Sequence, residues 1–196
     1  MRDKNTSVKD FRELVSEIGM LITYEATRDL PLTTKHIKTP ICEMDAPTLA
    51  GKKFVVVPIL RAGLGMVDGM LNLIPAAKVG HIGMYRNEET LVPVEYYCKL
   101  PNDINEREVF VLDPMLATGS SMELAYEALR TKGHPAHIHV ASIIASKQAI
   151  EYLQRKMPDD ITNIWVAAVD DELDDHSYIC LLYTSPSPRD AHESRM

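Results

Sequence analysis

The sequence predicts an α/β fold in which a mostly parallel sheet is flanked by helices, with an N-terminal helix and a β-arm. Apolar strand-like runs alternate with helix-like segments along most of the chain. In the run KKFVVVPIL (52–60), every residue after the two lysines is apolar, which is typical of a strand covered on both faces. Strands that alternate with helices in this way form βαβ units and therefore a parallel sheet.

The composition is that of one globular domain, which we place at residues 1–180. The chain has 196 residues, of which 45% are hydrophobic and 25% charged. It lacks an apolar run of about 18 residues, the length that would span a membrane. No apolar signal segment begins the chain and its three cysteines lack CxxC spacing, so a cytoplasmic location is expected. A net charge of -7 argues against a nucleic-acid surface, so a polyanionic ligand would need a local cluster of residues.

The first expected elements are a helix and two short strands. Apolar residues recur at helical spacing across residues 7–27, and Ser7 is the expected N-cap. Prolines then interrupt a segment that we expect to form short strands around Ile37 and Ile41.

The remaining elements alternate. We expect strands at residues 52–60, 78–85, 107–113, 137–145 and 163–171, and helices within residues 61–75, 120–133 and 146–157. The segment 86–100 is expected to turn at Asn87 and continue as a polar extended arm, a hairpin over the sheet. Gly133 is expected to close the helix before it.

Three of the expected strands end in charged residues. Arg61, Arg86 and Asp113 each follow an apolar strand. Ligands of open parallel sheets bind at the carboxyl ends of strands, where loops and helix N-termini meet. The sequence therefore predicts one anionic-ligand site at this edge.

The loop after Asp113 has the composition of a phosphate-binding loop. Small residues from Ala117 to Ser121 let backbone N–H groups approach an anion at the start of a helix, and we expect a side chain at Gly119 to obstruct the phosphate. The patterns GxxxxGK[ST] and GxGxxG are absent, which disfavours an NTPase or a dinucleotide reader. Asp113 could accept hydrogen bonds from sugar hydroxyls, while guanidinium groups could bind a second phosphate.

Each of these features has a plainer interpretation when taken alone. A Thr-Gly-Ser turn can be only a helix N-cap, a single arginine can be solvated, and an aspartate can be a turn residue. His137 and His139 share one face of a strand but have no evident third metal ligand nearby. The occurrence of all three charged strand ends together favours a sugar-phosphate site.

The chain resembles a known enzyme family. VVPILRAGLGM, GMYRNEET and VLDPMLATGSS together are similar to the motifs of uracil phosphoribosyltransferases, over about residues 2–179. Pro114 stands where most other phosphoribosyltransferases have a second acidic residue, as in this family. The resemblance implies a type I phosphoribosyltransferase fold.

The resemblance also implies a reaction and a set of site residues. Uracil and phosphoribosyl pyrophosphate would give UMP and pyrophosphate, with Mg²⁺ bound through the pyrophosphate. Arg61 and Arg86 would bind the pyrophosphate, Ile179 would begin the uracil pocket, and Asp113 and Arg86 would be the catalytic residues. The expected ribose 5-phosphate site is Asp113, Pro114, Met115, Leu116, Ala117, Thr118, Gly119, Ser120 and Ser121. GTP would be an activator, and the protein a homodimer or higher homo-oligomer.

The two ends of the chain depart from the family pattern. After Ile179 the family has a Gly-rich stretch whose backbone reads uracil, whereas here residues 181–196 form an unrelated tail that we expect to be disordered. The family also has about two dozen residues before the position of Met1, so both ends are expected to be incomplete. We therefore expect the chain to bind the ribosyl donor but to transfer poorly to uracil. Two alternatives stay open: a non-enzymatic regulator that senses phosphoribosyl pyrophosphate, and a phosphoribosyltransferase for another nucleobase.

Overall fold

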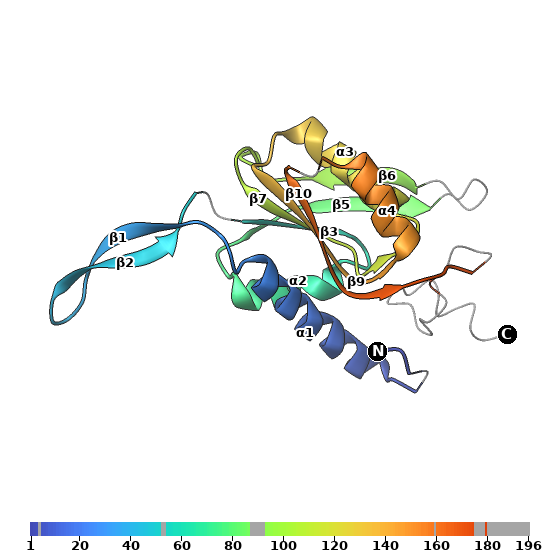
Figure 1. Ribbon diagram of the computed structural model, residues 1–196, viewed down its shortest axis with the longest axis horizontal. Helices are drawn as coiled ribbons and strands as arrows, with labels where there is room; N and C mark the ends of the chain where they lie inside the picture. The colour runs from blue at the N-terminus through green and yellow to red at the C-terminus, as the bar shows by residue number, and fades with distance from the viewer. Residues whose placement is uncertain (4, 52–53, 87–92, 159, 175–178, 180–196) are drawn as a thin grey trace.

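A mostly parallel sheet crosses the body of the protein, and helices cover both of its faces (Figure 1). The computed structural model describes residues 1–196 except 4, 52–53, 87–92, 159, 175–178 and 180–196. The predicted turn at Asn87 and tail at 181–196 therefore lie outside the described residues.

The order of the strands in the sheet is β10-β9-β7-β3-β5-β6. The bounds are β3 (Val55–Leu60), β5 (His81–Arg86), β6 (Pro93–Lys99), β7 (Glu108–Leu112), β9 (His137–Ser146) and β10 (Thr162–Asp170). All neighbouring pairs along this path are parallel except β5 with β6. Two short strands extend the sheet, β4 (Lys78–Val79) beside β3 and β8 (Met115–Leu116) beside β9. The predicted fold class is confirmed.

The helices lie where the apolar periodicity predicts them. Their bounds are α1 (Val8–Ala26), α2 (Leu64–Leu73), α3 (Ser120–Lys132) and α4 (Lys147–Lys156). The predicted cap of α1 is confirmed, because the Ser7 hydroxyl accepts a hydrogen bond of 3.1 Å from the Asp10 N–H. None of the described helices is long and apolar enough to span a membrane.

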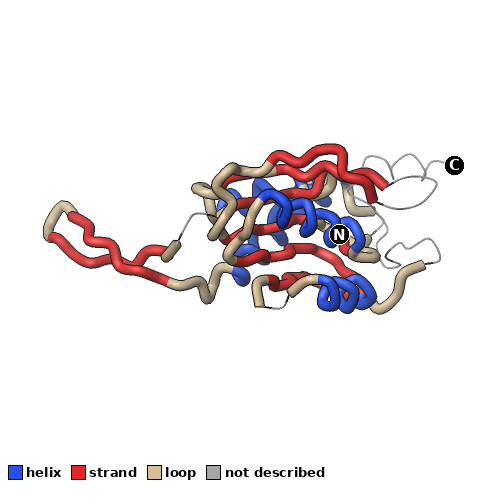
Figure 2. Tube along the Cα trace, turned by 90° about the horizontal axis from the view of Figure 1, so that it is seen from above, coloured by secondary structure: helices blue, strands red, loops and turns tan. Residues whose placement is uncertain are grey.

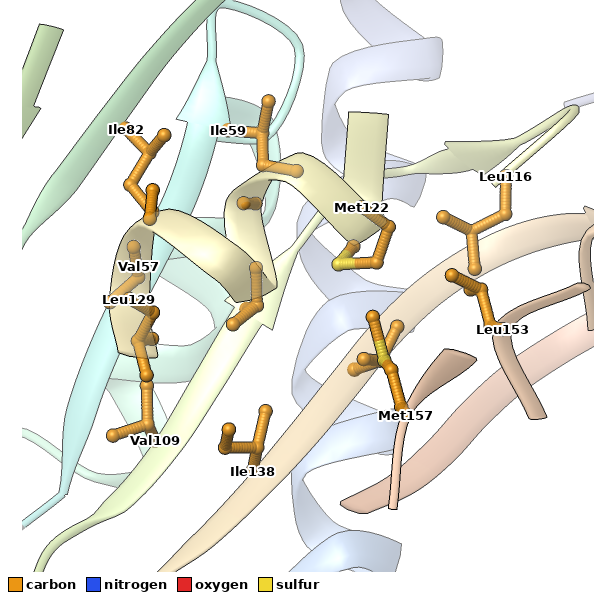
Figure 3. Close-up of a cluster of buried hydrophobic side chains, with 14 of the residues drawn as sticks. Val57, Ile59, Ile82, Val109, Leu116, Met122, Leu129, Ile138, Leu153 and Met157 are labelled. Carbon is orange, nitrogen blue, oxygen red and sulfur yellow. The ribbon is translucent and has the colours of Figure 1, made fainter. Parts of the chain in front are cut away.

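Two apolar clusters hold the helices against the sheet. The cluster under α3 and α4 joins these helices to β3, β5, β7 and β9 (Figure 3). Its labelled residues are Val57, Ile59, Ile82, Val109, Leu116, Met122, Leu129, Ile138, Leu153 and Met157. The second cluster lies between the sheet and α1 and α2. Burying one such side chain stabilises the fold by roughly 1.5–3 kcal/mol, so the strand ends rest on a rigid base.

The β-arm is not where the sequence placed it. Residues 93–99 form β6, which pairs antiparallel with β5 as the expected hairpin requires, but at the edge of the sheet and not over it, and the half-buried Cys98 packs on the core. The segment that projects is the hairpin of β1 (Leu32–Lys38) and β2 (Glu43–Leu49) (Figures 1 and 2). Ile41 lies in its turn and not in a strand, with 94% of its surface exposed.

Gly133 ends α3 for a different reason from the one predicted. Its φ of 168° is extended backbone, not a left-handed helix cap. A Cβ at this position would lie 2.5 Å from Cγ2 of Ile104 and 2.6 Å from Oδ1 of Asn105. Close approach to the loop before β7 therefore favours glycine here.

Candidate active site

The sheet changes direction of winding between β3 and β7. The chain passes from β3 to β5 on one side, then returns across β3 to β7 and continues to β9 and β10 on the other side. Arg61 follows β3 and Asp113 follows β7, so the two residues flank this switch point. The crevice outside the carboxyl ends of such strands is the usual ligand site of open α/β sheets.

The turn that carries Arg61 packs closely against the end of β7. The Gly63 N–H donates a hydrogen bond of 2.9 Å to the Ile59 carbonyl. A Cβ on Gly63 would lie only 2.4 Å from the carbonyl oxygen of Leu112, the residue before Asp113. Glycine therefore permits a contact that brings the turn beside Asp113. Arg61 itself is exposed, and the Leu60–Arg61 peptide bond is cis.

Arg86 ends β5 at the same edge of the sheet. β5 runs parallel to β3, with Gly83 opposite Leu60, so the backbone of Arg86 lies beyond the end of β3. The Arg86 side chain lies outside the described residues.

Asp113 is a half-buried residue whose carboxyl group is poorly solvated. Its N–H donates to the Ala141 carbonyl at 3.2 Å, and its Oδ1 accepts a hydrogen bond of 3.2 Å from the Met115 N–H. Burial raises the pKa of Asp113 to about 6, an effect that the Met115 N–H partly offsets. A carboxylate with such poor solvation gains from hydrogen-bond donors such as the hydroxyls of a sugar.

The first half of the loop after Asp113 is joined to β9. The Pro114 carbonyl accepts hydrogen bonds from the Ile143 and Ile144 N–H groups at 3.1 and 3.0 Å. The next two residues form β8, and the Ala117 carbonyl accepts a hydrogen bond of 2.6 Å from the Ser146 hydroxyl. The loop therefore continues the sheet before it turns into α3.

The second half of the loop is a helix N-terminus, where the only side-chain contact to a backbone N–H among the described residues is a long one of 3.5 Å from the Ser120 N–H to the Thr118 hydroxyl. Gly119 is the N-cap of α3, with a φ of 84°, and it supplies no side-chain cap. The Thr118 hydroxyl lies 2.9 Å from the Ser120 hydroxyl, which places two hydroxyl groups at the same turn. Backbone N–H groups, hydroxyls and the helix dipole together can bind a phosphate.

The expected reason for Gly119 is wrong. A Cβ there would point to α4, at 3.1 Å from Cδ1 of Tyr152 and 3.3 Å from the carbonyl of Ala149, and not into the phosphate-binding turn. The positive φ and the contact with α4 together favour glycine.

Several residues that support this loop were missed from the sequence. Ser146 caps α4, accepting from the Ala149 N–H at 2.9 Å, while its hydroxyl also reaches Ala117. Lys156 forms an ion pair of 2.9 Å with Glu123 in the first turn of α3. A serine directly before a predicted helix could have suggested the cap, but only the fold shows which loop it contacts.

His139 and Ile179 are buried, whereas His137 is partly exposed. The Trp165 indole N–H donates to Nδ1 of His139 at 3.1 Å, so Nε2 carries the proton that faces Glu108 at 2.9 Å. No group of three or more metal-binding side chains occurs within the described residues. Ile179 is 5% exposed and pairs with Leu173 within the cluster beside α1 and α2. Its place in a uracil pocket stays a prediction.

The comparisons with known proteins agree with this geometry. A family model described as "Uracil phosphoribosyltransferase" matches residues 1–181. A protein of that name from Clostridium perfringens is 59% identical over 179 residues, which cover 91% of this chain and 84% of the relative. One from Streptococcus pyogenes is 56% identical over the same shares of both chains.

Solved structures agree as well. The AQ2163 protein from Aquifex aeolicus superimposes with a TM-score of 0.84 at 36% identity, over 91% of this chain and 84% of that one. A hypoxanthine-guanine phosphoribosyltransferase from Bacillus anthracis has a TM-score of 0.54 at 13% identity, over 83% and 80% of the two chains, and supports the fold alone.

Proposed function

This chain belongs to the uracil phosphoribosyltransferase family, and we propose that the site between β3 and β7 transfers ribose 5-phosphate from phosphoribosyl pyrophosphate to uracil. The family match spans residues 1–181 and includes every described residue of the site. The observation that carries the proposal is the placement of Arg61 and Asp113 on either side of the switch point, with the loop after Asp113 leading into the N-terminus of α3.

The two halves of the site bind the two ends of the donor. The turn at Thr118–Ser121 holds the 5-phosphate, and the Asp113 carboxylate accepts hydrogen bonds from the ribose hydroxyls. Arg61 and, by resemblance, Arg86 bind the pyrophosphate. Holding both ends orients C1 of the ribose toward the base.

The reaction moves charge onto the leaving group. A uracil nitrogen forms the new bond to C1 while the C1–oxygen bond to pyrophosphate breaks, and the proton of that nitrogen passes to solvent. The ribose ring becomes positively charged and the pyrophosphate gains negative charge. Arginine side chains aimed at that group stabilise the charge where it develops.

Mg²⁺ fits a site of this composition. Mg²⁺ in enzymes is commonly bound by substrate phosphates together with one or two carboxylates, and Asp113 supplies a carboxylate beside the place of the pyrophosphate. When bound, Mg²⁺ neutralises part of the leaving-group charge.

Regulation, assembly and location are further parts of the proposal. The family resemblance supports activation by GTP and a homodimer or higher homo-oligomer. The three cysteines, which lack CxxC spacing and are expected to be reduced, support a cytoplasmic location.

The residues after Ile179 are proposed to limit transfer to uracil. The family reads uracil with a Gly-rich backbone, whereas Pro186 and Pro188 each lack a backbone N–H donor. A site that recognises a base by hydrogen bonds loses selectivity when the donors are missing. The test compares this chain with a chimera that carries the family ending after Ile179. Equal rates of UMP formation would refute the proposal.

Turnover of isotope-labelled nucleobases tests the function itself. The chain or the chimera should convert uracil, in the presence of phosphoribosyl pyrophosphate and Mg²⁺, faster than cytosine, hypoxanthine or adenine. Faster turnover of another base would reassign the substrate. Binding of phosphoribosyl pyrophosphate without turnover of any base by either protein would favour a non-enzymatic regulator.

A further inference from the structure

Ser146 connects the phosphate-binding loop to α4 through one buried hydroxyl. The residue is fully buried at the end of β9. Its hydroxyl donates a hydrogen bond of 2.6 Å to the Ala117 carbonyl and accepts one of 2.9 Å from the Ala149 N–H. A single proton donor therefore determines the direction of the Ala117 carbonyl.

The direction of that carbonyl determines the direction of the next N–H group. The only cis peptide bond of the described chain is Leu60–Arg61, so the Ala117–Thr118 bond is trans. In a planar trans peptide the C=O and N–H bonds point in opposite directions. With the Ala117 carbonyl directed at Ser146, the Thr118 N–H points away from β9 and α4.

The residues on either side of the Ala117–Thr118 peptide are held in place, so this peptide is the part of the loop that can rotate. On one side, Leu116 pairs with Ala145 in the sheet. On the other, Gly119 begins α3 in a left-handed conformation. The Ala117–Thr118 peptide lies between these two fixed segments, so its rotation decides whether an N–H or a carbonyl oxygen faces the anion.

We propose that Ser146 is a positioning residue that holds the Thr118 N–H toward the 5-phosphate of the ribosyl donor. The inference rests on the proposed function, because it needs a phosphate in this loop. Without the Ser146 hydroxyl the peptide can rotate, and a carbonyl dipole turned toward the phosphate would repel it.

Ser146→Ala tests this, with Ser7→Ala as the matched control. Ser7 caps α1 through the Asp10 N–H, so both variants remove a helix N-cap, but only Ser146 reaches the phosphate-binding loop. Calorimetry should show about tenfold weaker binding of ribose 5-phosphate and of UMP by Ser146→Ala, the effect of one misdirected hydrogen bond to an anion. Binding of pyrophosphate alone should be unchanged, and Ser7→Ala should bind all three like the wild type.

The amide signal of Thr118 gives a second readout that lost stability would not change. In ¹H–¹⁵N spectra of the wild type, ribose 5-phosphate should shift this proton downfield, and Ser146→Ala should lose the shift. If Ser146→Ala does not fold, Ser146→Cys keeps the volume and a weaker donor, and should give a smaller loss of the same kind.

The outcomes separate the inference from the function. A wild-type chain that does not bind ribose 5-phosphate would refute the proposed function, and the inference with it. A wild type that binds, together with a Ser146→Ala variant of equal affinity and equal Thr118 shift, would refute the role of Ser146 alone. Equal losses for pyrophosphate and ribose 5-phosphate would show a general structural role and also refute it.

Discussion

The Tyr152 hydroxyl of α4 donates a hydrogen bond to the Glu123 carboxylate in the first turn of α3. Lys156, one turn further along α4, pairs with the same carboxylate at 2.9 Å. Both groups lower the pKa of Glu123, and the Tyr152 hydroxyl has the larger effect. A negative charge thus lies beside the proposed phosphate site, and two groups of α4 hold it.

Removing the Lys156 ammonium should therefore weaken phosphate binding. In Lys156→Met the Glu123 charge loses its counter-ion, and affinity for ribose 5-phosphate should fall about two- to threefold, because the pair is partly solvated. The loss should shrink at high salt and disappear in the double variant with Glu123→Gln. Lys78→Met, which removes an ion pair with Asp103 at the start of the strands, is the control. An equal loss in Lys78→Met would contradict the local effect.

Gly119→Ala should destabilise the protein more than Gly51→Ala. Both glycines have positive φ values, 84° and 80°, so both substitutions carry the left-handed backbone cost of about 1–2 kcal/mol. Only Gly119 has close neighbours, since a Cβ on Gly51 would meet nothing within 4 Å. Urea denaturation measures the loss of stability in each variant, and the difference between the two losses is the cost of the contact with α4. Equal losses would show that this contact can relax without cost.

Asp113→Asn should stabilise the protein above pH 6 and not at pH 4. The pKa of Asp113 is about 6 in the folded chain, against an ordinary value of 3.8. For an acid whose pKa is raised by folding, the stabilising contribution is complete below the unfolded value and is lost as pH rises through the folded value. Replacing the carboxylate should therefore add about 1–3 kcal/mol to the free energy of unfolding at pH 7.5.

The same variant should bind phosphoribosyl pyrophosphate more weakly, because the amide is a poorer acceptor for the ribose hydroxyls. Denaturation curves at pH 4 and 7.5, with calorimetry at pH 7.5, measure both effects. A stability difference that does not change with pH would show that burial of the charge is not its cause.

Arg61→Lys should weaken binding of the pyrophosphate of the donor and not binding of its 5-phosphate. Lysine keeps the charge but loses the planar fork, which should cost on the order of 1–3 kcal/mol with phosphoribosyl pyrophosphate. The loss should be small with UMP, which lacks the pyrophosphate. Arg12→Lys on the exposed side of α1 is the control. Equal losses for both ligands would place Arg61 elsewhere in the mechanism.

The sequence predicted the strands and helices of the body because their apolar runs are long and regular. The sequence did not indicate the projecting hairpin, because LTTKHIK (32–38) has little apolar patterning. Nor did it indicate that PVEYYCK (93–99) is a strand of the sheet, although a strand that begins with proline can lie at a sheet edge. The charged strand ends could be predicted, since a parallel sheet brings them to one edge. The contact of Ser146 with Ala117 and the burial of Asp113 could not, because each depends on residues distant in the sequence.

The pairing of β8 with β9 has a consequence for the kinetics of ligand capture. Binding loops usually belong to the least stable part of a protein and lose conformational freedom when a ligand arrives. Here β8 is paired with the buried strand β9, so the amides of Met115 and Leu116 should exchange with deuterium about as slowly as those of β9. Little ordering is left for the moment of binding, and the rate of donor association should then be set by diffusion and charge.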